Sequence, residues 1–417
     1  MAKVHPGPMR PYRVLDLTDR RGWLAGKVLA DLGAEVIKVE PRGGDHGRWD
    51  GPFFKGRRDL EAGLPFCFRN RGKRSVTLDL EKKDGREIFR RLAVKADALL
   101  ESFEPGVMEK WGLGYDVLSR LHPPLVYTAI TAFGGEGPYA SLKASDLTVF
   151  ALSGDMYITG DPDRPPVRIS VPQTFQHASM EGALYTAIAL YDAARTGRGQ
   201  KVDTSAHLAQ MRAMMNATPY PPLEGKNLKR MGEYFEIGPH RLRTVFKAKD
   251  GYITLMLFGP GSTFPDLMSW AQEEVPLPEE LEGVDWAAFS IMALFSDPGK
   301  LVLVEKACGY LAHFFPLHTK EELYEKAVEK RILLAPVRTT EDIRKDKQLE
   351  ARGYFVEVDH GKDGMVAYAG PWAKLSLTPL VHTPCAPCLG EANSYVYGEL
   401  LGLSPCEINS LSDLGVI

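Results

Sequence analysis

The strongest constraint on the fold is a strand–helix–strand pattern near the start of the sequence. Residues 13–17 (RVLDL) and 35–40 (EVIKVE) are apolar runs of strand length, and residues 24–32 have helical periodicity with Gly33 as a stop. Two strands joined by a helix form a βαβ unit, which requires a parallel sheet. The turn at residues 17–23 (LTDRRGW) has no GxGxxG motif, so a dinucleotide site is not supported.

The alternation of strands and helices continues to about residue 217 and predicts an α/β fold. We expect strands at 96–103, 125–133 and 201–204, and helices at 84–95, 107–122 (two short ones), 175–194 and 206–217. Residues 218–238 are rich in proline, glycine and charge, which indicates a domain crossing. Beyond it we expect a hairpin at 244–258, helices to about 317 and at 320–331 and 340–352, and a strand at 354–359.

Composition narrows the functional classes. A chain of 417 residues favours two domains, and a net charge of -3 gives no general attraction to nucleic acid. No apolar run is long enough to span a bilayer, and the N-terminus lacks the apolar core of a signal peptide. The five cysteines fit a reducing compartment. We therefore expect a cytoplasmic protein. Cys385 and Cys388 form a CxxC without a second ligand pair, so no metal site is expected.

Several blocks of sequence carry a resemblance to a known family. They are RVLDLTDRRGWLAGKVLADLGAEVIKVEPRGGDHGR, NRGKRSVTLDL, ALLESFEPGVMEKWGLGYDVLSRLHPPLVYTAITAFGGEGPYA, ARTGRGQKVDTS and LGEANSYVYGELLGLSPCEINSLSDLGVI. Five blocks in this order cover nearly the whole chain. Together they resemble the family III CoA-transferases, the carnitine and bile-acid CoA-transferase family.

The resemblance implies an unusual architecture. A large Rossmann-like domain would combine residues 1–217 with 332–417, and a smaller α+β domain with its linkers would be inserted at 218–331. Each chain would form an open ring, and two chains would interlock in an obligate dimer. No covalently bound cofactor is implied; CoA or acyl-CoA would be a substrate.

The chemistry implied is transfer of CoA between carboxylic acids. An aspartate attacks the donor acyl-CoA to give a mixed anhydride, the released thiolate converts this to an aspartyl-CoA thioester, and the acceptor acid collects the CoA. Counting back from Thr196, the aspartate position falls on Phe175, which cannot attack a thioester. Glu181, six residues on, is the fallback candidate.

Relatives with racemase activity use a histidine and an aspartate as acid–base groups, and both are replaced here. Ser145 takes the histidine position and Phe175 the aspartate position, so exchange of an α-proton is disfavoured. Asp146 has the simpler interpretation of capping the helix that follows it.

The residues at the positions that would meet the CoA phosphates include both positive and negative charges. Arg42, Lys73 and Arg74 are candidate phosphate ligands, or equally a solvated basic face. Glu104 stands where active members have arginine and would repel phosphate, although a glutamate at a helix N-terminus is also favourable on its own.

Two glycine-rich turns complete the predicted site. Gly134 and Gly137 match a turn near the thioester, and Gly135 replaces the usual glutamine. Residues 258–261 (FGPG) stand where active members have a mobile flap, or form an ordinary turn.

Three functional hypotheses follow. The chain is a non-catalytic subunit that supports a homologous subunit carrying the aspartate; or it is self-sufficient and uses another carboxylate; or it binds CoA without catalysis. No nucleic-acid or membrane partner is expected.

Overall fold

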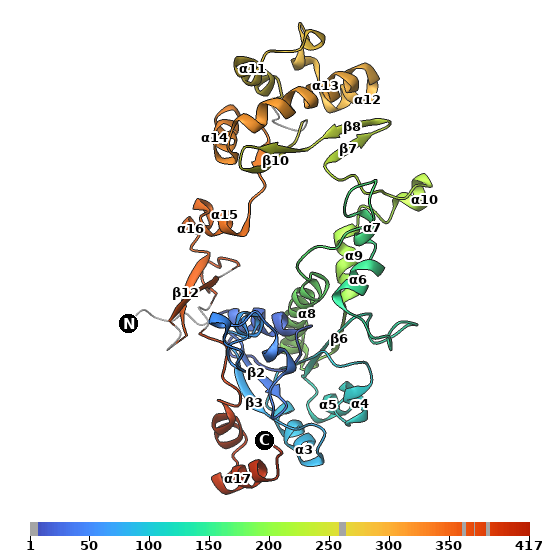
Figure 1. Cartoon of the computed structure of the whole chain (residues 1–417). Helices are drawn as coiled ribbons and strands as arrows, with labels where there is room; N and C mark the ends of the chain where they lie inside the picture. The colour runs from blue at the N-terminus through green and yellow to red at the C-terminus, as the bar shows by residue number, and fades with distance from the viewer. Residues whose placement is uncertain (1–6, 258–263, 361–363, 371, 381–383) are drawn as a thin grey trace. The chain divides into compact units, whose positions relative to one another are not determined.

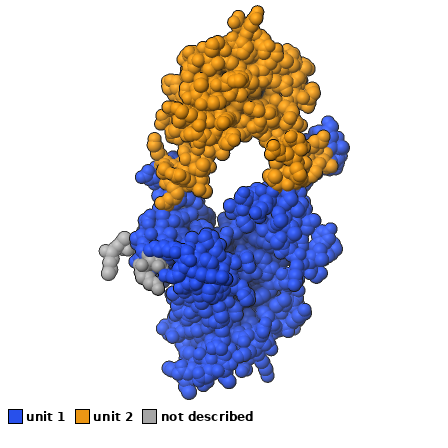
Figure 2. Space-filling model, in the orientation of Figure 1, with its two compact units in different colours: residues 1–156, 168–226, 348–417 blue, residues 157–167, 227–347 orange. Residues whose placement is uncertain are grey.

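The structure of the chain is a computed structural model that describes residues 7–257, 264–360, 364–370, 372–380 and 384–417 (Figure 1). The chain folds as two compact units, which Figure 2 shows in different colours. The first unit holds residues 1–156, 168–226 and 348–417, and the second holds residues 157–167 and 227–347.

The first unit is built on a parallel six-stranded sheet with the order β3-β2-β1-β4-β5-β6. Val14 of the central strand has Val36 on one side and Ala98 on the other. The predicted βαβ unit and the parallel α/β sheet are therefore confirmed. The strands are β1 (Arg13–Leu17), β2 (Glu35–Glu40), β3 (Arg74–Thr77), β4 (Ala98–Glu101), β5 (Val126–Thr131) and β6 (Lys201–Ser205).

Helices cover both faces of this sheet, because successive strand residues point to opposite sides. Leu15 and Leu17 belong to the core of one face, and Val14 and Ile130 to the core of the other. The helices of this unit are α1 (Trp23–Asp31), α2 (Leu64–Arg69), α3 (Lys83–Ala93), α4 (Val107–Lys110), α5 (Tyr115–Leu121), α6 (Asp146–Leu152), α8 (Thr174–Thr196), α9 (Ala206–Met211), α10 (Tyr220–Glu224) and α17 (Pro405–Asp413), with α7 (Asp155–Ile158) and α16 (Lys347–Ala351) at unit boundaries.

The 23-residue helix α8 packs on β5 through small residues. A Cβ on Gly182 would lie 3.0 Å from the Ile130 side chain, so the helix and the strand approach closely. The helix ends at Thr196 and is followed by Gly197 with φ 70°, and a Cβ on Gly199 would lie 2.1 Å from the Leu125 carbonyl oxygen. Both glycines of the TGRGQ turn are thus required by backbone geometry.

The structure differs from expectation mainly where helices end. The helix predicted at 340–352 is two helices, α15 (Thr340–Arg344) and α16, and the one predicted at 206–217 is α9 followed by a 3₁₀ turn at Arg212–Met214. The strand β3, inside a block recognised only by resemblance, was not predicted. It contains a single apolar residue, Val76, so periodicity gives little signal.

The C-terminal segment returns to the first unit. The amide of Asp79 donates to the carbonyl of Val416, and the Tyr397 hydroxyl donates to the carbonyl of Thr77. Val416 and Ile417 are buried in the same core as Leu15. The described part of the segment also contains a π-helix, Ser394–Leu400, and before it the hairpin β12 (Phe355–Asp359) and β13 (Met365–Ala369).

The second unit is an α+β body with its own core. The predicted antiparallel hairpin is present as β9 (Val245–Ala248) and β10 (Gly251–Leu255), and β11 (Leu334–Pro336) joins it. The other elements are β7 (Tyr234–Ile237), β8 (His240–Arg243), α11 (Phe264–Glu274), α12 (Ile291–Ser296), α13 (Pro298–Phe314), α14 (Lys320–Lys330) and α15.

Candidate functional site

A cavity of about 610 Å³ opens where the strand order reverses, between β1 and β4. Ligands of open parallel sheets bind outside the carboxyl ends of the strands at such a point. Arg20, Lys38, Arg42 and His46 contribute basic groups to the lining, while Asp19, Glu40, Asp45, Asp79 and Glu81 contribute carboxylates. The rest of the wall comes from the ends of four strands and the loops after them, with Trp111 added from the end of α4: Leu17, Thr18, Val39, Pro41, Gly47, Leu78, Leu80, Phe103 and Trp111.

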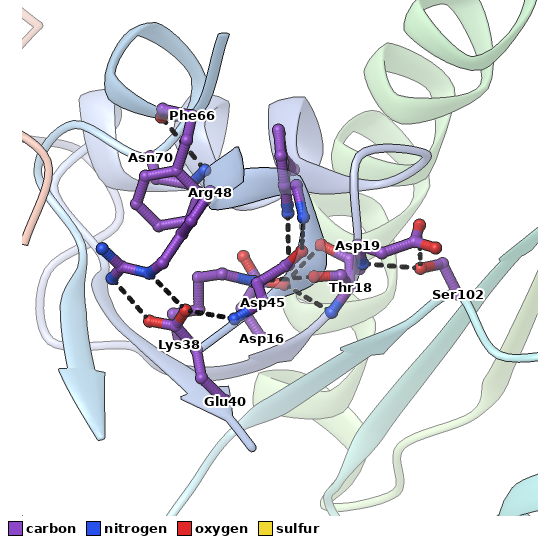
Figure 3. Close-up of polar contacts among 12 residues, drawn as sticks. Asp16, Thr18, Asp19, Lys38, Glu40, Asp45, Arg48, Phe66, Asn70 and Ser102 are labelled. Carbon is purple, nitrogen blue, oxygen red and sulfur yellow. Dashed lines mark hydrogen bonds and ion pairs between the residues drawn. The ribbon is translucent and has the colours of Figure 1, made fainter. Parts of the chain in front are cut away.

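A buried network of charges holds the loops of this cavity in place (Figure 3). Lys38 Nζ donates to the Thr18 carbonyl (2.8 Å) and to Asp45 Oδ2 (3.0 Å). Asp45 also accepts hydrogen bonds from Trp23 Nε1 and the Gly47 amide, both at 2.8 Å. Burial opposes the charge on Lys38, but the surrounding carboxylates outweigh it and raise the lysine pKa. The network fixes the loops after β1 and β2.

Lys73 belongs to the interior of this unit. Its Nζ donates to Asp16 Oδ2 (2.6 Å), the Trp23 carbonyl (2.8 Å) and Asn70 Oδ1 (2.8 Å). Burial lowers the pKa of Lys73 to about 8, with Asp16 acting in the opposite direction. All three ammonium protons thus have acceptors, which is a different role from the phosphate contact expected.

Arg42 and Arg74 lie in different places. Arg42 lines the cavity, and its guanidinium lies beside Gly415, as does Lys82 Nζ, which donates to the Gly415 carbonyl (2.9 Å). Arg74 pairs with Glu35 (3.2 Å), lies over the Tyr395 ring at 4.8 Å, and lines a separate hollow of about 420 Å³. The structure does not bring the three predicted phosphate ligands together.

Glu104 is engaged in an ion pair. Arg21 Nη1 contacts Glu104 Oε1 at 2.8 Å, and Arg21 Nε contacts Asp19 Oδ2 at 3.0 Å. Asp19 in turn accepts a hydrogen bond from Ser102 (2.9 Å; Figure 3). One arginine thus lies between two carboxylates beside the cavity, and the cluster carries a formal charge of minus one.

Phe175 is the second residue of α8 and is 7% exposed. It belongs to the same buried cluster as Val149 and Ala178. One turn further on, Ser179 Oγ donates to the Arg21 carbonyl (2.9 Å), so the start of α8 meets the loop that carries the Arg21 cluster. The position that resemblance assigns to the nucleophile is occupied by a buried ring.

The neighbouring polar residues serve as helix caps. Asp146 Oδ1 accepts from the amide (2.8 Å) and hydroxyl (2.7 Å) of Thr174, the first residue of α8. The helix that Asp146 itself begins is capped by Ser145, through a capping box with Thr148. The cap expected from Asp146 therefore belongs to α8 and not to the helix that follows it.

Glu181, the fallback nucleophile, lies on α8 with its carboxylate 3.0 Å from Arg212 Nε. It lines a hollow of about 430 Å³ between α8, β6 and α9, together with Tyr185 and Asp203. It is not part of the switch-point cavity lining.

The glycine turn follows β5. Gly134 and Gly137 have φ of 90° and 94°, values that favour glycine, and the Gly134 amide donates to Thr131 Oγ1 (2.9 Å). The Gly135 amide donates to Asp203 Oδ2 (2.8 Å), which anchors the turn to β6. The predicted flap at 258–261 lies outside the described residues.

The sequence did not single out three basic residues at or beside the cavity, nor a buried carboxylate at the end of a neighbouring strand. Arg20, Arg21 and Lys82 follow strand ends, and that placement was the available signal. Glu101, at the end of β4, is buried, and this raises its pKa to about 7. Its pairing with the Phe103 amide (2.7 Å) could not be read from the sequence.

Across the described ranges, no group of three or more His, Cys, Asp or Glu residues is placed to hold a metal ion. None of the helices within those ranges has the length and apolar character needed to cross a bilayer.

Comparison with known proteins gives a consistent result. The chain is 33% identical to the succinyl-CoA:(R)-benzylsuccinate CoA-transferase subunit BbsE of Thauera aromatica, over 97% of each chain. It is 31% identical to a succinyl-CoA–L-malate CoA-transferase alpha subunit of Chloroflexus aurantiacus, over 98% of this chain and 92% of that one. The structure resembles a CAIB/BAIF family protein from Brucella suis with a TM-score of 0.78 and 29% identity, covering 95% and 100% of the two chains. The pattern that defines CoA-transferase family III matches residues 9–393, and the chain belongs to that family.

Proposed function

We propose that this chain is a non-catalytic subunit of a heteromeric family III CoA-transferase and supports a homologous subunit that carries the catalytic aspartate. The observation that carries the proposal is Phe175. A buried ring in an apolar cluster replaces the carboxylate that must become first an anhydride and then a thioester. The names of two relatives, both described as subunits of CoA-transferases, agree with it.

The complex would move CoA from an acyl-CoA donor to a carboxylic acid. Succinyl-CoA is the donor named for both relatives, and (R)-benzylsuccinate is the acceptor named for the first. We take this pair as the first substrates to assay.

The assembly would follow the family architecture. The first unit (residues 1–156, 168–226 and 348–417) would correspond to the large domain, and the second unit (157–167 and 227–347) to the inserted one. The chain would form an open ring that interlocks with the partner ring. Such an interface explains why a subunit without the nucleophile is retained, since the active chain would depend on it for folding.

The switch-point cavity is the place where this chain would contact the nucleotide part of CoA. Arg42, with Arg20 and His46, would meet phosphate oxygens, and Gly134 and Gly137 would let the backbone approach the thioester. Glu104 would oppose this binding.

The proposal is tested by co-expression with family III chains that carry aspartate at the position of Phe175. Native mass and transfer from succinyl-CoA to benzylsuccinate are measured for the pair and for this chain alone. We expect activity only in the pair, and no carboxylate of this chain trapped by hydroxylamine. Turnover by the lone chain with labelling at Glu181 would establish the self-sufficient enzyme instead. Micromolar CoA binding without any turnover in a complex would favour the binding module.

A further inference from the structure

Helix α8 presents an apolar stripe to solvent. Met180, Leu184, Ile188 and Tyr191 recur at helical spacing and are 41%, 53%, 54% and 65% exposed. Glu181 is the only charged residue between His177 and Asp192. A helix whose inner and outer faces are both apolar is normally buried on both sides.

The stripe continues onto α9. Ile188 and Leu208 line the same hollow of about 430 Å³, and Leu208 is 63% exposed. Arg212 also lines this hollow, and its guanidinium contacts Glu181 (3.0 Å) and the Tyr185 hydroxyl (2.6 Å). We call the five residues Met180, Leu184, Ile188, Tyr191 and Leu208 the α8–α9 face.

A second observation at this hollow points to a missing neighbour. Thr204 lies on β6, the edge strand of the sheet, and lines the hollow while being only 3% exposed. Within the described residues its Oγ1 has no hydrogen-bond partner. Buried hydroxyls are nearly always paired, so this one is suited to a group supplied from outside the chain.

The exposed apolar area is large for a surface without function. Taking about 200 Å² for a fully exposed large side chain, the face presents on the order of 500 Å². This is at the upper end of the largest apolar patches on monomers, and it is more than half of the ~800 Å² that each partner buries in a stable complex.

We propose that the α8–α9 face is the docking surface for the homologous, aspartate-bearing subunit. The inference rests on the proposed function and names where the partner binds. The partner would apply an apolar helical surface to the stripe and a polar group to Thr204 Oγ1. Area and chemistry favour a folded subunit over a small ligand, since the stripe runs along three turns of one helix.

The test compares two matched double substitutions in the full chain. Leu184→Glu with Ile188→Glu places two charges on the face, and Val117→Glu with Leu121→Glu places two charges at the same spacing on exposed residues of α5. Each variant is co-expressed with a tagged aspartate-bearing homologue. The complex is quantified by the amount of this chain recovered with the tag and by native mass, and the folding of the variant is checked by its unfolding midpoint. We expect at least 100-fold less complex for the α8 pair, and an unchanged amount for the α5 pair. Should the α8 pair fail to fold, Leu184→Gln with Ile188→Gln replaces it.

The outcomes separate this inference from the function on which it rests. If the unmodified chain binds the homologue and the folded α8 variant binds equally well, the docking surface is wrong while the subunit role stands. If the unmodified chain binds no homologue, the proposed function fails and the docking assignment fails with it. Loss of self-association in the α8 variant would then assign the face to a second copy of this chain.

Discussion

Replacing Phe175 by aspartate restores the chemical group that the family uses, yet we expect it to damage the fold and give no transferase activity. The matched control is Phe175→Asn, which has the same size and lacks the charge. Both variants lose the burial of the ring, which costs about 3–5 kcal/mol for a large-to-small change. The difference between them isolates the cost of the charge.

The magnitude follows from the surroundings of the side chain. Burial raises the pKa of a carboxyl group by up to about 3–5 units, which corresponds to about 4–7 kcal/mol at a pH above the shifted value. The N-terminus of α8 favours an anion by up to about 2 kcal/mol. Asp146, which caps this helix end through Thr174, adds repulsion. We therefore expect Phe175→Asp to be about 2–5 kcal/mol less stable than Phe175→Asn near pH 8.

The assay is urea unfolding of both variants between about pH 4 and 8, with transfer from succinyl-CoA measured in parallel. A carboxyl group with a raised pKa loses stability as pH rises, so the gap between the variants should widen toward pH 8. A gap that stays below about 0.5 kcal/mol at every pH would mean that the carboxylate is solvated at this position, and it would refute the burial argument. Substantial turnover by Phe175→Asp would refute the reasoning as well, since Glu104 and Gly135 also depart from the family pattern and site residues act together.

Three further outcomes are expected. Lys73→Met should lower the free energy of unfolding by about 3–5 kcal/mol because it leaves the Asp16 carboxylate buried and unpaired, whereas the exposed Arg74→Met should change it by less than about 1 kcal/mol in the same denaturation assay. Between pH 4.5 and about 7 the native chain holds a proton on Glu101 that the unfolded chain releases, so the free energy of unfolding falls as pH rises. Glu101→Gln should remove about 3 kcal/mol of that loss. A pH profile of stability that is the same in the variant would contradict the burial of Glu101. Glu104→Ala should tighten CoA binding a few-fold in calorimetry, because it removes one of two carboxylates beside Arg21, and an equal or weaker affinity would count against the charge argument.

The sheet could be predicted because its signal is local. Residues 13–40 contain two apolar runs and a helix with a stop, and the parallel pairing of β1 with β2 follows from them. Strand β3 was missed because Val76 is its single apolar residue, so its sequence shows no strand periodicity. The helix expected at 340–352 is two helices in the structure. Helix ends depend on tertiary contacts, which the helix propensity of the residues does not reveal.

The site could be predicted only in outline. The glycine turn follows a strand, as expected. Lys73 and Arg74 are adjacent in sequence, but one side chain is buried and the other is exposed. Lys73, in the turn before β3, is buried against Asp16, 57 residues away, whereas Arg74, the first residue of the strand, is exposed beside Glu35. Which of two neighbouring cations is solvated depends on the partner across the sheet, and a single sequence does not show that partner.

The return of the C-terminal segment to the first sheet has a consequence for synthesis. Asp79 lies just after β3, but its amide is paired only when Val416 has been made. Translation proceeds at about 5–20 residues per second. One apolar face of the sheet is therefore exposed for tens of seconds before residues 392–417 have been synthesised and can cover it. The second unit, encoded between them, can finish folding during that interval. The second unit can therefore be complete before the first sheet is covered, and the uncovered sheet is the part of the nascent chain that most needs protection from aggregation.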